Sequence, residues 1–212
     1  MLTAPNLIGF DWLLHGFGLR DSLYPAPITT LYQIHSATVV EAVGAGGDKI
    51  AEGDAIITRQ PGMVVGVRTA DCVPILIVDA RTHAVASVHA GWRGTAQTIV
   101  AAAVGELGTR YGSRPEDLHA AVGPAIGGCC YEVGPEVARR FGAWNPDLAQ
   151  AEEPVHIDLA SICEMQLRAA GVGDVWVAGE CTFCRAERFY SFRREKERAG
   201  RMISFAGVKT GG

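Results

Sequence analysis

The sequence predicts a mixed α/β (α+β) fold, and three observations support this class. Short β-branched runs fill the middle of the chain, Ala-rich segments with helical spacing follow, and the two kinds of segment do not alternate strictly. The chain of 212 residues is shorter than the roughly 250 to 300 residues at which a single core stops growing. No linker, repeat or charge run divides it. We therefore expect residues 1–212 to form one domain.

The individual elements follow from hydrophobic periodicity and from the residues that interrupt it. The expected strands are apolar runs bounded by turn residues, at 54–58, 63–69, 74–79, 84–89, 120–123, 175–178 and 203–206. The expected helices are 95–111, 135–141 and 158–171. Gly112 ends the first of these helices, and Asp158 is the expected N-cap of the third. The aromatic segment 189–192 fits a strand with one buried face or a stacking platform, and the core interpretation is favoured.

Composition limits the partners of the chain. With 48% hydrophobic residues, 20% charged residues and a net charge of −4, the chain resembles neither a disordered protein nor a polyanion binder. Its apolar stretches are too short to span a membrane, and the N-terminal segment lacks the basic start of a secretory signal. We expect a cytoplasmic protein that acts on a small molecule, without nucleic-acid or membrane partners. The six cysteines are expected to be thiols or ligands rather than disulfides.

Three residues near strand ends could together hold a metal ion. His35, Cys72 and His89 offer two imidazoles and a thiolate, a donor set that zinc favours. Three protein ligands leave a fourth tetrahedral position open, as in catalytic zinc sites. The long sequence intervals between them leave open whether they converge, and the alternative is two core histidines and a buried thiol.

The segment after His89 could bind an anion. Gly91 and Gly94 permit close backbone approach, Trp92 offers a stacking face, and Arg93 offers a planar fork for phosphate or carboxylate. The amides at the start of the following helix would add to such a pocket. The alternative is an ordinary strand-to-helix turn. Phosphate-binding loops with the Gly-x-x-x-x-Gly-Lys pattern, dinucleotide fingerprints and Gly-x-Ser-x-Gly elbows are absent from the sequence.

An ordered series of motifs identifies a family. The series consists of Gln33-Ile-His35, Gly53-Asp-Ala55, 69–74, 89–94, 123–134 and 181–194. It resembles the laccase-domain or polyphenol-oxidase-like family, which includes proteins called purine nucleoside phosphorylases and peptidoglycan editing factors. The resemblance implies a mixed-sheet layered sandwich similar to the cysteine hydrolase fold of the necrotizing-factor toxins. It also implies that His35, Cys72 and His89 are the metal ligands, with zinc favoured over copper because a multicopper centre needs more histidines.

The resemblance further implies phosphorolysis of adenosine, inosine and methylthioadenosine, together with deamination of adenosine. Zinc would activate water for the deamination, and Arg93 with Arg193 or Arg194 would bind the phosphate. Asp71 is expected to orient a ligand or to act as a general base, and its alternative role is to cap a turn. Cys130 is expected to line the substrate pocket, with a buried structural thiol as the alternative.

Two other functions use the same residues. In a metal-independent cysteine hydrolase or amidase, Cys72 would be the nucleophile, His89 the base, and the amides near Gly91 and Gly94 the oxyanion donors. That chemistry corresponds to the editing of peptidoglycan precursors. In a non-catalytic binding module, the ligand would bind without turnover, but this class gives no reason for three metal ligands beside arginines.

Two features depart from the expected patterns. Cys181 and Cys184 form a CxxC pair, but no second CxxC completes a zinc knuckle, so a structural or pocket-lining role is expected. The stretch between Gly18 and Gln33 is shorter than in members of the family. A neighbouring chain, as in a homodimer, would then supply part of the pocket wall, and the sequence leaves the oligomeric state open.

Overall fold

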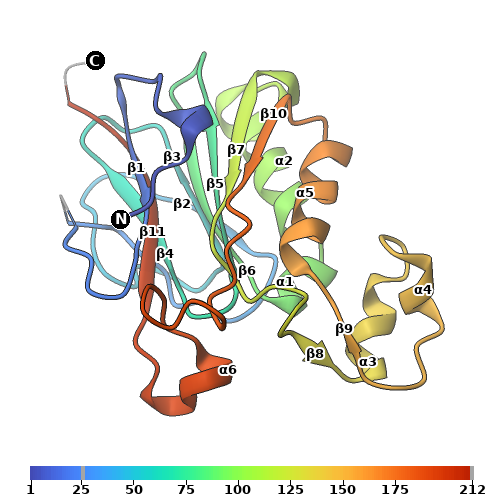
Figure 1. Cartoon of the computed structure of the whole chain (residues 1–212). Helices are drawn as coiled ribbons and strands as arrows, with labels where there is room; N and C mark the ends of the chain where they lie inside the picture. The colour runs from blue at the N-terminus through green and yellow to red at the C-terminus, as the bar shows by residue number, and fades with distance from the viewer. Residues whose placement is uncertain (25–26, 211–212) are drawn as a thin grey trace.

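The computed structural model of the chain describes residues 1–24 and 27–210 and has three layers (Figure 1). A six-stranded mixed sheet lies in the middle, the two longest helices cover one of its faces, and a three-stranded antiparallel sheet covers the other. The mixed α/β class expected from the sequence is therefore confirmed.

The strands are β1 (Leu13–Phe17), β2 (Val39–Glu41), β3 (Ala55–Thr58), β4 (Val64–Thr69), β5 (Val73–Asp79), β6 (Val85–Ala90), β7 (Leu118–Val122), β8 (Glu132–Val133), β9 (Val155–His156), β10 (Asp174–Val177) and β11 (Met202–Val208). The helices are α1 (Trp92–Ala96), α2 (Ile99–Tyr111), α3 (Pro135–Ala138), α4 (Pro146–Ala149), α5 (Leu159–Ala169) and α6 (Phe192–Glu195). Short 3-10 turns cover Pro5–Leu7, Pro115–Asp117, Arg139–Phe141 and Lys196–Arg198.

The central sheet has the order β10-β7-β5-β6-β3-β2. The inner pairs β7·β5, β5·β6 and β6·β3 are antiparallel, and the outer pairs β10·β7 and β3·β2 are parallel. The second sheet has the order β1-β11-β4 and is antiparallel throughout. Strands β8 and β9 form a small separate ladder beside α3 (Figure 1).

Strand β5 shows why both faces of the central sheet are buried. Ile75 and Ile77 pack into the cluster that contains α2 and α5, while Leu76 and Val78 pack into the cluster under the second sheet. Successive side chains of a strand point to opposite faces, so a continuous apolar run can serve two cores. The same alternation carries the cysteine and histidine residues at the ends of β5 and β6 to defined faces.

Each expected strand outside 189–192 is confirmed, and no boundary shifts by more than two residues. The expected helix 95–111 is instead two helices, α1 and α2. The break lies at Thr98, whose φ of 56° places it in the left-handed region that interrupts a right-handed helix. The expected helix 135–141 is one turn of α3 followed by a 3-10 turn. Asp158 is the N-cap of α5, and its Oδ1 accepts a hydrogen bond from the amide of Ser161.

The strand interpretation of 189–192 is wrong. Phe189 is fully buried in a non-helical segment, and Phe192 begins α6 and is 40% exposed. The Ser191 hydroxyl accepts a hydrogen bond from the amide of Arg194, which starts the helix at this point. Over the described part of the chain, no helix combines the length and the apolar character needed to cross a bilayer.

Candidate active site

The β5–β6 hairpin brings Cys72 next to His89. Residue Val73 pairs with Ala90 and Pro74 pairs with His89, so the start of β5 lies beside the end of β6. Cys72 directly precedes β5, on the face that also carries Leu76. A separation that is long in sequence therefore becomes a contact, because an antiparallel hairpin returns the chain to its starting edge.

His35 reaches the same point from a turn before β2. Asp54, which directly precedes β3, accepts hydrogen bonds from the backbone amides of His35 at 3.0 Å and Ser36 at 2.6 Å. The side-chain amide of Gln33 pairs with the backbone of Arg68, donating to its carbonyl and accepting from its N–H, both at 2.8 Å. These contacts fix the turn to the central sheet and to β4.

The three predicted metal ligands lie together. The ligand atoms of His35, Cys72 and His89 are all within 4.8 Å of one another. The imidazole rings of His35 and His89 meet edge to face, with centroids 4.9 Å apart. Gly91 is adjacent, and a Cβ there would come within 2.9 Å of His35 Cδ2 and 3.2 Å of Cys72 Sγ. The absence of a side chain at this glycine thus leaves room for the ligands.

Asp54 also orients His89. Its Oδ1 lies 2.8 Å from His89 Nδ1, and both side chains are buried. This contact leaves Nε2 of His89 free to face Cys72 and His35, the usual arrangement of a carboxylate behind a metal-binding or catalytic histidine. Burial by itself raises the pKa of Asp54, but hydrogen bonds from His89 and Ser36 lower it to about 2.

The thiol of Cys72 and the imidazole of His89 affect each other strongly. Burial raises the pKa of Cys72, yet the charge of His89 and hydrogen bonds from both histidines lower it to about 6. Burial lowers the pKa of His89, yet the neighbouring thiolate and Asp54 raise it to about 9. The pair therefore favours a thiolate, which is the form that binds metals and attacks electrophiles.

A cavity of about 640 Å³ opens onto the triad. Its lining combines cationic side chains with aromatic ones: Lys49, Arg68, Arg193, Lys196 and Arg201, with Tyr32, Trp92, Tyr131 and Phe192. Cavities of this size hold small organic molecules. Cations suit an anionic group and aromatic faces suit a flat ring, so the cavity can hold a ligand that contains both.

The three arginines expected to bind phosphate lie in different places. Arg193 lines the cavity, and its guanidinium stacks over the ring of Tyr131 and donates to the carbonyl oxygen of Glu132. Arg93 does not line the cavity and stacks over the ring of Trp92. Arg194 does not line it either, because its guanidinium is bound to backbone carbonyls and to the Glu195 carboxylate.

Asp71 lies in the cavity wall beside Cys72. Its Oδ1 accepts a hydrogen bond from the Thr182 hydroxyl at 2.7 Å, and its Oδ2 accepts one from the backbone amide of Arg193 at 2.6 Å. Asp71 has a φ of 89° and His35 a φ of 59°, both in the left-handed region that non-glycine residues avoid. Such conformations concentrate at functional sites. The contacts of Asp71 favour a positioning role over that of a general base.

Cys130 does not line the cavity. It lies in a cluster with Cys129, Cys181 and Cys184, so neither a pocket-lining residue nor a buried lone thiol describes it. All six cysteines are free thiols in this structure, as the sequence predicts.

Sequence reasoning gave no role to Asp54, Tyr131 or Lys196. Asp54 belongs to the Gly53-Asp-Ala55 motif, and a carboxylate directly before a buried strand is the signal that points to it. Tyr131 follows Cys130 in a glycine-rich loop and lines the cavity. Lys196 lies in a charged segment that is typical of a solvated turn, and only the tertiary structure places it at the cavity.

Comparisons with known proteins complete the description of the site. A family model described as multi-copper polyphenol oxidoreductase laccase matches residues 19–209. The chain is 40% identical over 183 residues to a purine nucleoside phosphorylase of Deinococcus radiodurans, covering 84% of this chain and 69% of the relative. It is 40% identical over 163 residues to adenosine deaminase RL5 of an unknown prokaryotic organism, covering 73% and 61%. The crystal structure of YlmD from Geobacillus stearothermophilus aligns with a TM-score of 0.80 at 32% identity, covering 86% and 73%.

Proposed function

Because the chain belongs to the multi-copper polyphenol oxidoreductase laccase family, as its motifs predict, we propose that it is an enzyme of purine nucleosides. The proposed activity is zinc-dependent phosphorolysis of adenosine, inosine and methylthioadenosine, with deamination of adenosine. The observation that carries this proposal is the cavity in which two imidazoles and a thiol lie beside cationic and aromatic side chains. The names of relatives, purine nucleoside phosphorylase and adenosine deaminase, agree with it.

The donor set at the triad fits a zinc ion. His35, Cys72 and His89 would hold the ion, since their ligand atoms converge and Asp54 keeps Nε2 of His89 available. When bound, such an ion acts as a Lewis acid and lowers the pKa of water in its open position. A copper centre of the multicopper type needs more imidazoles than converge here, so we favour zinc over copper.

The side chains of the chain would bind the nucleoside and the phosphate. Arg193 and Lys196 project charge into the cavity and are the groups we assign to phosphate. Tyr131 and Phe192 offer faces for the purine ring. Placing phosphate beside the sugar carbon in this way replaces a bimolecular encounter by a fixed geometry and stabilises the cationic transition state of the ribose. Asp71 holds Arg193 through its backbone amide, which positions this cation.

A cysteine hydrolase or amidase that edits peptidoglycan precursors is the second candidate. The chain of contacts from Cys72 to His89 to Asp54 favours this candidate. In it, Cys72 has the position of a nucleophile, His89 that of a base, and Asp54 that of the carboxylate that orients the base. The expected similarity to the cysteine hydrolase fold of the necrotizing-factor toxins would also agree with this candidate, and that similarity stays a prediction. The solved structure reported above supports the fold of the YlmD group.

The deciding experiment incubates zinc-loaded protein with adenosine, with and without phosphate, and separates adenine, inosine and hypoxanthine by chromatography. Phosphate-dependent adenine, or inosine without phosphate, is expected from the wild type and not from the Cys72→Ala variant. If zinc is required, its removal by a chelator abolishes both nucleoside reactions. The metal-independent hydrolase chemistry of the second candidate would not be affected by zinc removal. A folded, zinc-loaded protein that makes none of these products refutes the purine assignment.

We also propose that residues 1–212 act as one domain in the cytoplasm. The two hydrophobic clusters lie on opposite faces of the same central sheet, which supports one folding unit. Six free thiols suit a reducing compartment. A neighbouring copy of the chain would complete the open side of the cavity, as expected from the short stretch before Gln33.

A further inference from the structure

Four cysteines meet at one edge of the central sheet, away from the cavity lining. Strands β7 and β10 are parallel, so the segments that follow them leave the sheet at the same edge. Cys129 and Cys130 follow β7, and Cys181 and Cys184 follow β10. The two segments are joined by backbone hydrogen bonds from Thr182 to the Ala125 carbonyl at 2.9 Å and from Ala125 to the Glu180 carbonyl at 3.2 Å.

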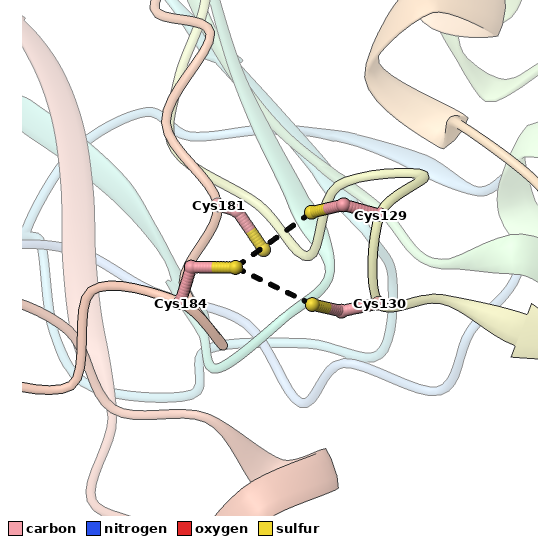
Figure 2. A group of neighbouring side chains, drawn as sticks. All are labelled: Cys129, Cys130, Cys181 and Cys184. Atoms are coloured by element: carbon pink, nitrogen blue, oxygen red, sulfur yellow. Dashed lines mark hydrogen bonds between the residues drawn. The ribbon is translucent and has the colours of Figure 1, made fainter.

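The four sulfur atoms point toward a common centre (Figure 2). All lie within 4.8 Å of one another, with Cys184 Sγ at 3.7 Å from Cys129 Sγ and 3.4 Å from Cys130 Sγ. Sulfur atoms around one tetrahedral zinc ion, with bonds of about 2.3 Å, lie about 3.8 Å apart. In a cluster of several irons, different thiolates bind different irons and are spread more widely. The observed spacing therefore fits a single ion.

The surroundings of the sulfur atoms also suit a thiolate site. The backbone amide of Gly127 lies 3.3 Å from Cys181 Sγ and donates to it. The guanidinium of Arg194 donates to the carbonyl oxygens of Thr182 at 2.8 Å and Phe183 at 2.7 Å, both within the Cys181–Cys184 turn. One amide donor and one partly buried guanidinium thus stabilise negative charge on this turn. Arg194, which does not reach the cavity, has a structural function here.

We propose that Cys129, Cys130, Cys181 and Cys184 bind one zinc ion in a closed four-thiolate site. Binding forms four Zn–S bonds, and each thiol loses its proton to solvent, so one Zn²⁺ replaces four protons. No electron is transferred. The four thiolates would fill all four coordination positions of the ion, so none would remain open for water. The site is structural, in contrast to the three-ligand site at His35.

The proposed ion would stabilise the segments that hold Asp71 and Tyr131 in the cavity wall, without lying in the cavity itself. Thr182, between the two cysteines of the CxxC, donates its hydroxyl to Asp71 beside Cys72. Tyr131, which lines the cavity, directly follows Cys130. The ion would tie these two segments together where they lack a helix or strand of their own. Its loss is expected to disturb the positions of Asp71 and Tyr131 without removing any group that contacts substrate.

The test measures bound metal in the Cys72→Ala background, in which the triad has lost its thiolate ligand. Protein purified in reductant without added metal is expected to contain one zinc per chain by elemental analysis. Adding Cys129→Ser and Cys184→Ser is expected to reduce this to near zero, whereas adding Cys163→Ser, at a buried cysteine outside the cluster, should not. Cobalt substituted for zinc should show intense sulfur-to-cobalt absorption that the double serine variant lacks.

A second measurement avoids dependence on the serine variants. Titration of the Cys72→Ala protein with an organomercurial should release one zinc ion as four thiols react. Zinc that stays below a tenth of an equivalent, or that leaves without thiol modification, overturns the proposal. So does a stoichiometric disulfide between the two segments in reduced, freshly purified protein, or iron in place of zinc. Because the triad is disabled throughout, these results are independent of the proposed nucleoside activity.

Discussion

Substitution of Asp54 by asparagine tests the core of the candidate active site. Oδ1 of Asp54 faces the amide of His35 and Nδ1 of His89, while Oδ2 faces the amides of Ile34 and Ser36 and the Ser36 hydroxyl. Asparagine replaces one of these two acceptors by an NH₂ group. Whichever oxygen the NH₂ group replaces, the N–H and O–H groups that donate to that oxygen in the wild type will face a donor instead of an acceptor.

The expected effect follows from the two orientations of the new amide. If NH₂ faces Nδ1 of His89, that nitrogen must accept, the proton moves to Nε2, and the lone pair directed at the triad is lost. Loss of an orienting partner of this kind lowers metal affinity about 10- to 100-fold, or about 1.4 to 2.8 kcal/mol. If NH₂ faces the Ser36 turn, unsatisfied donors lower the free energy of unfolding by about 1 to 3 kcal/mol.

The assay is a zinc competition titration against a chromophoric chelator, in the Cys129→Ser/Cys184→Ser background so that only the triad contributes. Asp79→Asn is the matched control. Asp79 is also fully buried and accepts hydrogen bonds from the amides of Arg81 and Thr82, but it lies at the far end of the β5–β6 hairpin. The control should lose stability and keep its zinc affinity. A folded Asp54→Asn protein with affinity within twofold of its background refutes the reasoning.

Three further predictions use other residues. Gly91→Ala should weaken zinc binding at the triad at least tenfold by titration, because its Cβ meets His35 and Cys72, whereas Gly105→Ala, in open space on α2, should keep it. Arg193→Gln should raise the KM for phosphate about tenfold in the phosphorolysis assay; an equal rise for Arg93→Gln would refute our assignment. Burial raises the pKa of Asp79, but hydrogen bonds from neighbouring hydroxyl and amide groups hold it below its ordinary 3.8. Its stabilisation is therefore complete above about pH 5 and lost as the pH falls through the folded pKa, so urea denaturation should show the Asp79→Asn deficit shrinking below pH 4.

The sequence alone predicts much of the central sheet and the identity of the triad residues. Strands β3 to β6 are predictable because they are largely apolar, which is typical of strands whose two faces are both buried. The convergence of Cys72 and His89 required the hairpin register, which periodicity does not supply. Asp54 had no assigned role because its importance lies in five contacts with residues distant in sequence.

The cysteine cluster shows a second limit of sequence reasoning. A CxxC without a partner motif at Cys181 has no metal interpretation by spacing, and the adjacent pair Cys129-Cys130 has none either. Only the parallel pairing of β7 with β10 makes them neighbours. The split of the expected helix at Thr98 has a similar cause, since a polar residue inside an apolar pattern does not reveal its backbone conformation.

The three residues of the triad differ in how firmly the fold holds them. His89 lies within β6 and Cys72 directly precedes β5, so their separation changes only when the central sheet opens. His35 sits on an exposed turn whose amides are tied down chiefly by one carboxylate. Amide hydrogen exchange should therefore be slow along β6 and much faster at 34–36, and zinc should slow only the latter. Two ligands thus form a preassembled half-site, and a local opening of the turn that carries the third would set the rate at which a bound ion could enter and leave.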